Sequence, residues 1–410
     1  MNRYSRITGW GMYVPERRLT NHDLEQMVDT SDKWIVERTG IRERRIVGPG
    51  ETTRTMSVAA ARRALEVAGI GPQDLDLIIV ASSSPDHLLP TVATQIQADL
   101  GADGVPAFAL VAGCTGFVYG LVNAHQFVVS GAYDRVLVIG AETISKAVNW
   151  EDRTTCVLFG DGAGAVVVEA SQTPGGLLAF ELGADGSNWD ALMIPAGGVA
   201  HPPDHEMIDK KLYTIRMNGR AVFRFATRVM TEATRRVITE AGLTPDEIGL
   251  LIPHQANLRI IEYAAKKLGF PMEKVMVNIH KYGNTSAASI PLALVEALEE
   301  GRVKPGDNIV MVGFGAGLTW GAVVWHWQPV SPEEEAILVE DWPIPQVLQS
   351  GLRQVRSRAW NTRVAISEKA TLALLPLYAW THKLRKSVSL PQVSLPKLPT
   401  TRRDERDRRR

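Results

Sequence analysis

Residues 62–79 read RRALEVAGIGPQDLDLII, and residues 235–252 read RRVITEAGLTPDEIGLLI. The two segments align without a gap at an offset of 173, and seven of their eighteen positions are identical. At the same offset, DRVLVIG (134–140) matches DNIVMVG (307–313) in its apolar pattern. Two collinear matches at one offset indicate an internal duplication, although a generic helix–Gly–Pro–strand unit could recur by coincidence.

Each copy has the pattern of a helix followed by a buried strand. In the first copy, Val58, Ala61, Leu65 and Val67 have helical spacing, and Gly69 is a C-cap that ends the helix. Continuous apolar runs typical of strands buried on both faces follow at 75–80, 107–111, 136–139, 165–168, 250–252, 309–312 and 322–325. Helical segments lie between them at 117–130, 220–241, 258–268 and 288–300. This alternation, present twice, predicts a layered α/β body with two related sheets.

The composition is that of an ordinary globular protein. Of 410 residues, 45% are hydrophobic and 22% charged, and the net charge is zero, which argues against disorder and against nucleic acid as a partner. Only two cysteines occur, which fits a reducing compartment. The N-terminus has no secretion-signal pattern, and no apolar run approaches the ~18–20 residues that span a bilayer. We therefore expect a cytoplasmic protein.

The net charge of zero hides a division along the chain. Residues 331–410 hold 4 Lys and 11 Arg against 9 acidic residues, whereas the first 330 residues carry an acidic excess. Prolines and the acidic run 333–335 mark the boundary. We interpret 1–330 as the folded body and 331–410 as a basic, Pro-punctuated appendage.

The segment 107–129, AFALVAGCTGFVYGLVNAHQFVV, carries the first candidate for chemistry. An apolar strand leads into Gly113 and Cys114, and a helical pattern starts at Phe117. A cysteine at the start of a helix lies at the positive end of the helix dipole, which favours the nucleophilic thiolate. Cys114 is therefore a candidate nucleophile, although most free cysteines are small buried hydrophobes.

Two polar residues lie at similar junctions in the second copy. His254 stands just past a buried strand in LLIPHQANLRIIEYAAKKLG (250–269), and Asn284 stands in a turn that opens a helix in NIHKYGNTSAASIPLAL (278–294). Alone, His254 would be a core histidine and Asn284 a capping residue. Together with Cys114, they make one convergent site plausible.

Two other segments are weaker as signals of binding. GDGAGAVVVE (160–169) and GFGAGLTWGAVVW (313–325) are each followed by a strand rather than a helix, so we interpret them as tight hairpin turns near a substrate. His201 and His205 in HPPDHE lack a third ligand, which favours a surface loop over a metal site.

These segments resemble those of the β-ketoacyl-acyl carrier protein synthase III family, the initiating condensing enzymes of bacterial fatty acid synthesis within the thiolase-like superfamily. The resemblance rests on TSDKWIVERTGIRERR, AGCTGFVYGL, FGDGAGA, IPHQANLRI, YGNTSAAS and FGAGLTWG, which lie in the family's order. It implies an α/β, thiolase-like, five-layered αβαβα fold of two duplicated halves. The halves would be 1–172, with the cysteine, and 173–330, with the histidine and asparagine. Nothing in the resemblance covers 331–410.

The resemblance also implies a reaction. Cys114 would attack an acyl-CoA thioester, release CoA and hold the acyl group. Malonyl-acyl carrier protein would then lose carbon dioxide while His254 and Asn284 donate hydrogen bonds to the enolate oxygen. The carbanion would attack acyl-Cys114 to give 3-oxoacyl-acyl carrier protein, with the backbone N–H groups of Cys114 and Ala316 around the second oxyanion. No cofactor or metal is implied, since acyl-CoA and malonyl-acyl carrier protein are substrates.

Further positions resemble the family's substrate contacts. Those expected to bind CoA are Trp34, Arg38, Thr39, Arg153 and Arg259. Those expected to receive the acidic carrier protein are Arg259, Lys266 and Lys267. A tryptophan can stack on adenine and arginines pair with phosphates, but Trp34 could instead be a core residue and the basic face merely solvated.

Leu89, just before Pro90, matches the position that reaches the neighbouring subunit's acyl pocket in the family, so a homodimer is expected. Acetyl-CoA is the default primer, with branched or medium chains left open. In the appendage, 352–366 and 370–386 mix apolar and basic residues. This suits weak membrane-surface contact, carrier-protein recruitment or a tail without direct function.

Two rival functions remain open at the level of sequence. A related condensing enzyme of polyketide or secondary-metabolite synthesis, using another starter, would carry the same three site residues. A non-catalytic acyl-binding homologue would keep the fold, but such proteins commonly lose part of the site, whereas Cys114, His254 and Asn284 are all present.

Overall fold

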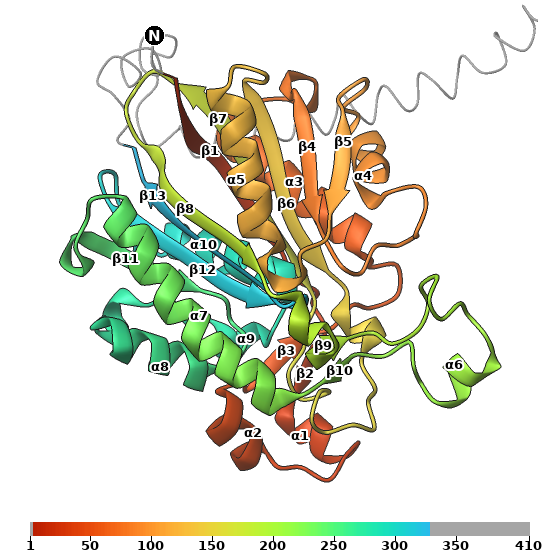
Figure 1. Cartoon of the computed structure of the whole chain (residues 1–410). Coiled ribbons are helices and arrows are strands. Elements are labelled where there is room, and N and C mark those ends of the chain that lie inside the picture. Colours follow the sequence, from red (N-terminus) through yellow and green to blue (C-terminus); the bar gives the residue numbers. More distant parts are fainter. Residues whose placement is uncertain (1–2, 329–410) are drawn as a thin grey trace, which may run out of the picture. The chain divides into compact units, whose positions relative to one another are not determined.

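Two sheets organise residues 3–328, the part of the chain that this computed structural model describes (Figure 1). The larger has the strand order β1-β7-β6-β4-β5, and the smaller has the order β11-β12-β13-β8. The strands of the larger sheet are Tyr4–Tyr13 (β1), Leu77–Ala81 (β4), Ala107–Leu110 (β5), Arg135–Glu142 (β6) and Gly162–Ser171 (β7). Those of the smaller are Gly176–Ala184 (β8), Ile248–Pro253 (β11), Asn308–Gly315 (β12) and Thr319–His326 (β13).

Three layers of helices complete this body. They are α3 (Thr53–Ala68) with α4 (Val92–Leu100), α5 (Gly116–Val129) with α10 (Ser289–Glu299), and α7 (Gly219–Glu240) with α8 (Leu258–Leu268). The first pair packs on the larger sheet, the last on the smaller, and α5 and α10 contact both sheets (Figure 1). The predicted five-layered thiolase-like arrangement is therefore confirmed.

Short elements surround one end of the layers. They are Arg18–Thr20 (β2), Asn21–Glu25 (α1), Asp32–Thr39 (α2), Glu43–Arg45 (β3), Leu192–Met193 (β9), His205–Asp209 (α6), Arg216–Met217 (β10) and Ile279–Tyr282 (α9). Several of them share a small apolar cluster around Ile35, Ile41 and Ile279.

The central helices explain why the layers hold together. Phe117 and Leu121 in α5, and Ile290 and Leu294 in α10, are almost completely buried. A helix that is apolar on two opposite faces belongs between two apolar surfaces, and these two helices lie between the sheets. Truncating a side chain such as Phe117 to alanine would cost about 3–5 kcal/mol of folding free energy.

The 173-residue offset is carried into the strand register. β4 pairs in parallel with β6, with Leu77 opposite Val136, and β11 pairs in parallel with β12, with Leu250 opposite Ile309. Each of these pairs is displaced from the other by the offset found in the sequence, and α5 and α10 begin at that same offset. The predicted boundary at 172/173 falls between β7 and β8.

Two details of the prediction were wrong. The run 107–111 was expected to be buried on both faces, but β5 has only one neighbouring strand and lies at the sheet edge, where Phe108 and Val111 are exposed. Val67 is 42% exposed because it points away from the buried face of α3. The appendage 331–410 and the contacts expected of it lie outside the described residues. Within 3–328, no helix is long and apolar enough to cross a bilayer.

Candidate active site

Cys114 lies in the connection between β5 of the larger sheet and α5 of the central helix layer. A single 3-10 turn, Gly113–Thr115, connects the end of β5 to the N-terminus of α5. Gly113 adopts a φ of 55°, a left-handed conformation that glycine reaches without strain, and this lets the chain turn sharply before the helix. The nucleophile candidate is therefore on a turn held by a strand on one side and a helix on the other.

The electrostatic environment of Cys114 corrects one expectation. The helix dipole was expected to favour the thiolate, but Cys114 is only 7% exposed and its burial raises the pKa of the thiol to about 12. The hydrogen bond with Ser286 opposes this shift, whereas the negative charge of Glu142 adds to it. Cys114 is thus a protonated thiol at rest, and its attack on an electrophile requires a group that accepts the proton.

Asn284 reaches the same place from the second half of the chain. Its backbone N–H donates to Leu158 O at 2.8 Å, and its own carbonyl accepts from the N–H of Gly160 at 3.0 Å. Its side-chain Oδ1 accepts from Ser286 N at 2.9 Å. Because Oδ1 is occupied in this way, the Nδ2 group is the part of the amide left to donate to a ligand.

The first Gly-rich segment, residues 160–169, helps to hold the turn that carries Asn284. Gly160 to Gly162 lead into β7 after a long connection from β6, so the tight hairpin predicted there is wrong. An added Cβ at Gly160 would stand 2.2 Å from Tyr282 O, so a larger residue could not lie so close to the Asn284 turn. The second Gly-rich segment does form the predicted hairpin turn, between β12 and β13.

His254 follows β11 and is 1% exposed. Neither ring nitrogen has a hydrogen-bond partner, while the backbone N–H donates to Val312 O at 2.8 Å. Burial lowers the pKa of the imidazole to about 3, so the ring is neutral and can donate one N–H. An unsatisfied buried donor costs about 1–3 kcal/mol, which a ligand oxygen would relieve.

Gly313 lies between His254 and the turn that carries Cys114. An added Cβ at Gly313 would be 3.4 Å from His254 Cβ and 3.7 Å from Thr115 Cγ2. The phenyl ring of Phe314 meets the imidazole edge to face, with ring centroids 5.4 Å apart. The structure therefore brings Cys114, His254 and Asn284 into one region at the N-terminal ends of α5 and α10.

The hairpin turn after β12 closes on the nucleophile. A Cβ added at Gly315 would be 2.5 Å from Cys114 N, and one added at Gly113 would be 2.7 Å from Ala316 N. The backbones of the two turns are therefore in direct contact, and glycine is required on both sides. This places the two predicted oxyanion donors, Cys114 N and Ala316 N, next to each other.

Two further polar residues of this region, Glu142 and Ser286, were not predicted from the sequence. Glu142 is fully buried at the end of β6 and accepts from Ser286 Oγ at 3.0 Å. Ser286 has a φ of 50°, which costs a non-glycine residue about 1–3 kcal/mol. A signal for Ser286 was present, since it aligns with Gly113 at the 173-residue offset, but Glu142 had no motif that marked it.

Trp34 lies in α2 between two arginines. The Arg38 guanidinium carbon is 5.0 Å from the ring centroid and that of Arg153 is 5.4 Å from it. Arg153 also donates to Asp29 O at 2.7 Å. An aromatic face flanked by cations can accept a flat, negatively charged ligand such as a nucleotide.

Two other predicted CoA contacts differ from each other. Arg259 is exposed at the start of α8, and Asn257 Nδ2 donates to Arg38 O at 3.0 Å, which ties α8 to α2. Thr39 is 4% exposed, and its hydroxyl donates to Ile35 O at 2.7 Å while it accepts from Ile41 N at 3.1 Å. The Thr39 hydroxyl is thus occupied in shaping the end of α2.

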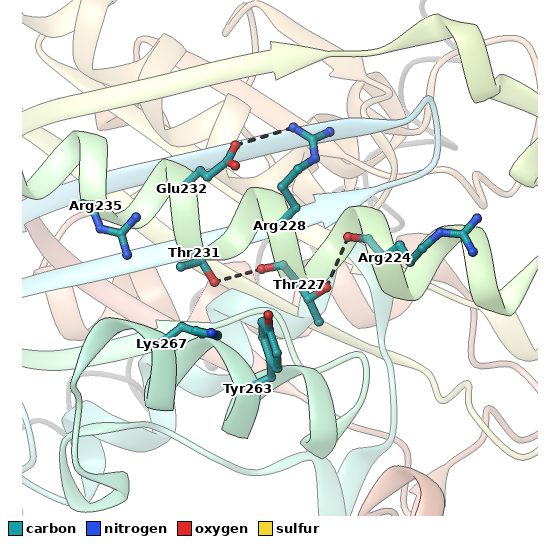
Figure 2. Close-up of a pocket in the computed structure, with 8 residues that line it drawn as sticks. All are labelled: Arg224, Thr227, Arg228, Thr231, Glu232, Arg235, Tyr263 and Lys267. Atoms are coloured by element: carbon teal, nitrogen blue, oxygen red, sulfur yellow. Dashed lines mark hydrogen bonds and ion pairs between the residues drawn. The ribbon is translucent and has the colours of Figure 1, made fainter.

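A basic groove runs between α7 and α8 (Figure 2). Its volume is about 440 Å³, and it is lined by Arg224, Thr227, Arg228, Thr231, Glu232, Arg235, Tyr263 and Lys267. Its four cations face a single carboxylate, Glu232, which pairs with Arg228 at 3.5 Å. Of the three predicted docking residues, Lys267 lines the groove, while Arg259 and Lys266 are exposed elsewhere on α8.

The α7 contribution to this groove was missed in the sequence. The arginines at 224, 228 and 235 follow helical spacing and could have been found as one basic face. Leu89 is 88% exposed on the loop after β4. Within residues 3–328 no cluster of three metal-ligating side chains occurs, His201 and His205 included.

Two family models match the chain. The model for 3-oxoacyl-[acyl-carrier-protein] synthase III matches residues 108–186, and the model for the C-terminal part of the same enzyme matches residues 238–327. Among curated relatives, the β-ketoacyl-[acyl-carrier-protein] synthase III of Symbiobacterium thermophilum is 55% identical over 321 residues, 78% of this chain and 97% of the relative. That of Caldanaerobacter subterraneus is 54% identical with the same coverage.

Solved structures agree with these relatives. The 3-oxoacyl-[acyl-carrier-protein] synthase III of Aquifex aeolicus has a TM-score of 0.73 and 52% identity, covering 78% of this chain and 99% of its own. The priming β-ketosynthase of the R1128 polyketide pathway has a TM-score of 0.74 but 37% identity, covering 80% and 97%. This chain is thus similar to condensing enzymes of both fatty acid and polyketide synthesis, and the cited identities are higher for the former.

Proposed function

This chain belongs to the β-ketoacyl-[acyl-carrier-protein] synthase III family, and on that premise we propose that Cys114, His254 and Asn284 carry out its condensation. The enzyme is a condensing acyltransferase of fatty acid synthesis. Its substrates are an acyl-CoA and malonyl-acyl carrier protein.

Cys114 attacks the acyl-CoA thioester and becomes acylated. The backbone N–H groups of Cys114 and Ala316 stabilise the tetrahedral oxyanion, because both turns present adjacent N–H groups at this point. CoA leaves, and the acyl group stays on the sulfur for the second substrate.

His254 and Asn284 then act on the malonyl group. Each donates a hydrogen bond to the thioester oxygen, so loss of carbon dioxide leaves a stabilised enolate that attacks acyl-Cys114. The observation that carries this assignment is the buried, neutral His254 ring with no partner on either nitrogen. A base would need the reverse arrangement, with a protonatable ring hydrogen-bonded to the thiol.

CoA binds at the face that holds Trp34. Adenine stacks on the Trp34 ring when Arg153 or Arg38 moves aside, and Arg38, Arg153 and Arg259 pair with the phosphates. The two cation–π contacts support this, since they place the positive charges of Arg38 and Arg153 beside a flat aromatic ring. Thr39 contributes by shaping the end of α2.

The carrier protein docks on the groove between α7 and α8 and on the adjacent end of α8. The excess of cations over carboxylates in that groove supports an acidic partner, as does the exposure of Arg259, Lys266 and Lys267. The aromatic ring of Tyr263, with Lys267 Nζ 5.7 Å from its centroid, adds apolar contact area.

The enzyme works as a homodimer through the edge strand β5. Three features support a second copy of this chain at that edge. The strand β5 has a free edge, Phe108 and Val111 are exposed, and Leu89 is 88% exposed. Leu89 then enters the acyl pocket of the partner subunit and limits primer size, with acetyl-CoA as the default primer. Weak contact of residues 331–410 with anionic membranes is a separate proposal, and deleting that segment would weaken co-sedimentation with anionic vesicles.

The test of function is a reconstituted condensation followed by mass spectrometry of the carrier protein. The wild type converts malonyl-acyl carrier protein and acetyl-CoA into 3-oxobutanoyl-acyl carrier protein, and Cys114→Ala does not. His254→Ala and Asn284→Ala still accept the acyl group but lose condensation by about 10²–10³-fold. A protein that binds acyl-CoA without forming product would be the non-catalytic homologue, and activity with another starter alone would favour the polyketide alternative.

A further inference from the structure

A buried carboxylate lies behind the nucleophile, and the mechanism above does not use it. Glu142 accepts from Ser83 N at 3.1 Å, from Ser286 Oγ at 3.0 Å and from Ser84 Oγ. The Ser83 N–H group and the Ser84 and Ser286 hydroxyls donate to this carboxylate, and these hydrogen bonds favour its ionised form, whereas burial raises its pKa. Glu142 is therefore a carboxyl group enclosed in the protein beside a protonated thiol, with donors placed to stabilise its ionised form.

Ser286 connects the two groups. Ser286 Oγ donates to Glu142 Oε1 at 3.0 Å, and the hydrogen bond of the same hydroxyl with the Cys114 thiol lowers the pKa of that thiol against the effect of burial. An oxygen that donates to the carboxylate keeps lone pairs to accept from the S–H group, so the three groups form a directed chain from sulfur to carboxylate. Nothing in the condensation steps assigned to His254 and Asn284 requires this chain.

The duplication makes the serine unusual. Ser286 and Gly113 are equivalent across the 173-residue offset, and both have a positive φ, 50° and 55°. In the first half a glycine adopts that conformation, whereas in the second half a serine adopts it. The hydroxyl is thus kept at a position where the backbone favours glycine.

We propose that Glu142, acting through Ser286, is the base that removes the proton from Cys114 when the acyl group is transferred. The Cys114 proton passes to Ser286 Oγ as the Ser286 hydroxyl proton passes to Glu142 Oε1. The sulfur electron pair forms the new C–S bond to the acyl carbon, and the old C–S bond breaks with its electron pair on the CoA sulfur.

Glu142 then returns its proton through the same chain to the departing sulfur. CoA leaves as a thiol, Glu142 is ionised again, and no other reactant is needed. Like charges this close disfavour each other, so Glu142 and Cys114 share one negative charge. The burial of the carboxylate, which raises its pKa, makes it a stronger base than an exposed glutamate. The titratable groups of this region are Cys114 from the turn before α5, Glu142 from β6 and the neutral His254 after β11.

The test is the pH dependence of Cys114 alkylation by iodoacetamide, measured by intact mass with Cys114→Ala as background. Sharing one proton predicts a wild-type rate that is independent of pH across the neutral range, because the two tautomers differ by no proton. Glu142→Gln and Ser286→Ala lose this plateau, and their rates rise about tenfold per pH unit, as expected of an isolated thiol. Asp161→Asn is the control, since Asp161 is an equally enclosed carboxylate that accepts from Ser145 and Val47 instead.

Acyl transfer from acetyl-CoA in a single turnover at pH 7 is slowed about 10²-fold in both variants. A plateau retained in Glu142→Gln and Ser286→Ala, or a wild-type rate that climbs tenfold per pH unit from the start, overturns the proposal. Should Glu142→Gln lose its cooperative melting transition, Ser286→Ala decides, because it leaves the other donors to Glu142 in place. The proposal rests on the proposed function, but alkylation needs no CoA, so a plateau without acylation would refute that function and not the shared proton.

Discussion

At the scale of single residues, the site depends on polar groups whose pKa values burial shifts away from those of exposed groups. His254 stays neutral because burial lowers its pKa to about 3, and Cys114 stays a thiol because burial raises its pKa to about 12. Neither state could be predicted from the sequence, because both depend on how completely the two halves enclose the groups. The residue types themselves could be predicted, since Cys114, His254 and Asn284 lie in recognisable segments at strand-to-helix junctions.

Burial of neutral His254 predicts a pH dependence of stability. The imidazole titrates near 6.5 when unfolded and near 3 when folded, so the unfolded state binds more protons between these values. Its contribution to stability is therefore complete above pH 6.5 and is lost as the pH falls toward 3. Between pH 7 and pH 5 this loss of folding free energy amounts to about 2 kcal/mol. Urea unfolding should show the wild type losing that much more than His254→Gln, and equal losses in both proteins would contradict a buried neutral ring.

Asn284 tests the charge requirement of the decarboxylation step. Asn284→Asp keeps the size and the Oδ1 acceptor for Ser286 N, but it replaces a donor with a carboxylate that repels the enolate. Release of carbon dioxide from malonyl-acyl carrier protein should fall by about 10²–10³-fold, while acylation of Cys114 by acetyl-CoA is retained. Decarboxylation at the wild-type rate in this variant would rule out the donor role.

At the scale of elements, two turns must touch for the oxyanion donors to meet. Gly315 at the end of β12 lies against the cysteine turn, where a Cβ would be 2.5 Å from Cys114 N. Gly315→Ala should therefore move the two turns apart and lower the rate of Cys114 acylation by about 10²–10³-fold. Gly186→Ala is the matched control, because a Cβ there meets nothing within 4 Å. A normal acylation rate in Gly315→Ala would mean that the two turns need no such contact.

The helices and strands themselves were more predictable than their neighbours in the sheets and the connections between them. Helical spacing and the Gly69 cap correctly predicted α3, which ends at Ala68 with Gly69 at a φ of 72°. The offset of the duplication also relates the strand pair β4–β6 to the pair β11–β12. The edge position of β5 was not predictable, because apolar runs look alike whether a strand has one neighbour or two. The segment at Gly160, where a hairpin was wrongly expected, has a glycine pattern like that of the segment that does form a hairpin between β12 and β13. Only the length of chain between β6 and β7 distinguishes the two.

At the scale of the molecule, charge reversal in the groove between α7 and α8 tests the docking surface. Arg224→Glu should raise the KM for malonyl-acyl carrier protein at least fivefold and weaken its salt dependence, because one cation becomes an anion. Acylation by acetyl-CoA should be unchanged. Arg62→Glu on α3 is the control for adding negative charge elsewhere on the surface. An unchanged KM in Arg224→Glu would place the carrier protein on another face.

The proposed dimer is tested at the exposed edge of the larger sheet. Phe108→Glu places a charge on β5, where a second copy would add its own strand, and light scattering should find a monomer where the wild type is a dimer. Leu178→Glu, at another exposed apolar residue on β8, is the control and should stay dimeric. If the wild type is itself a monomer, Leu89 cannot limit the primer from a partner subunit.

The central claim is that Cys114 carries the acyl group, and intact mass tests it most directly. The protein is exposed to acetyl-, isobutyryl- and longer acyl-CoAs beside Cys114→Ala and Cys156→Ala. We expect the gain of one acyl group in the wild type and in Cys156→Ala and no gain in Cys114→Ala, and the CoA that reacts fastest identifies the primer. An acyl gain that persists in Cys114→Ala, or no gain with any CoA, would contradict this claim.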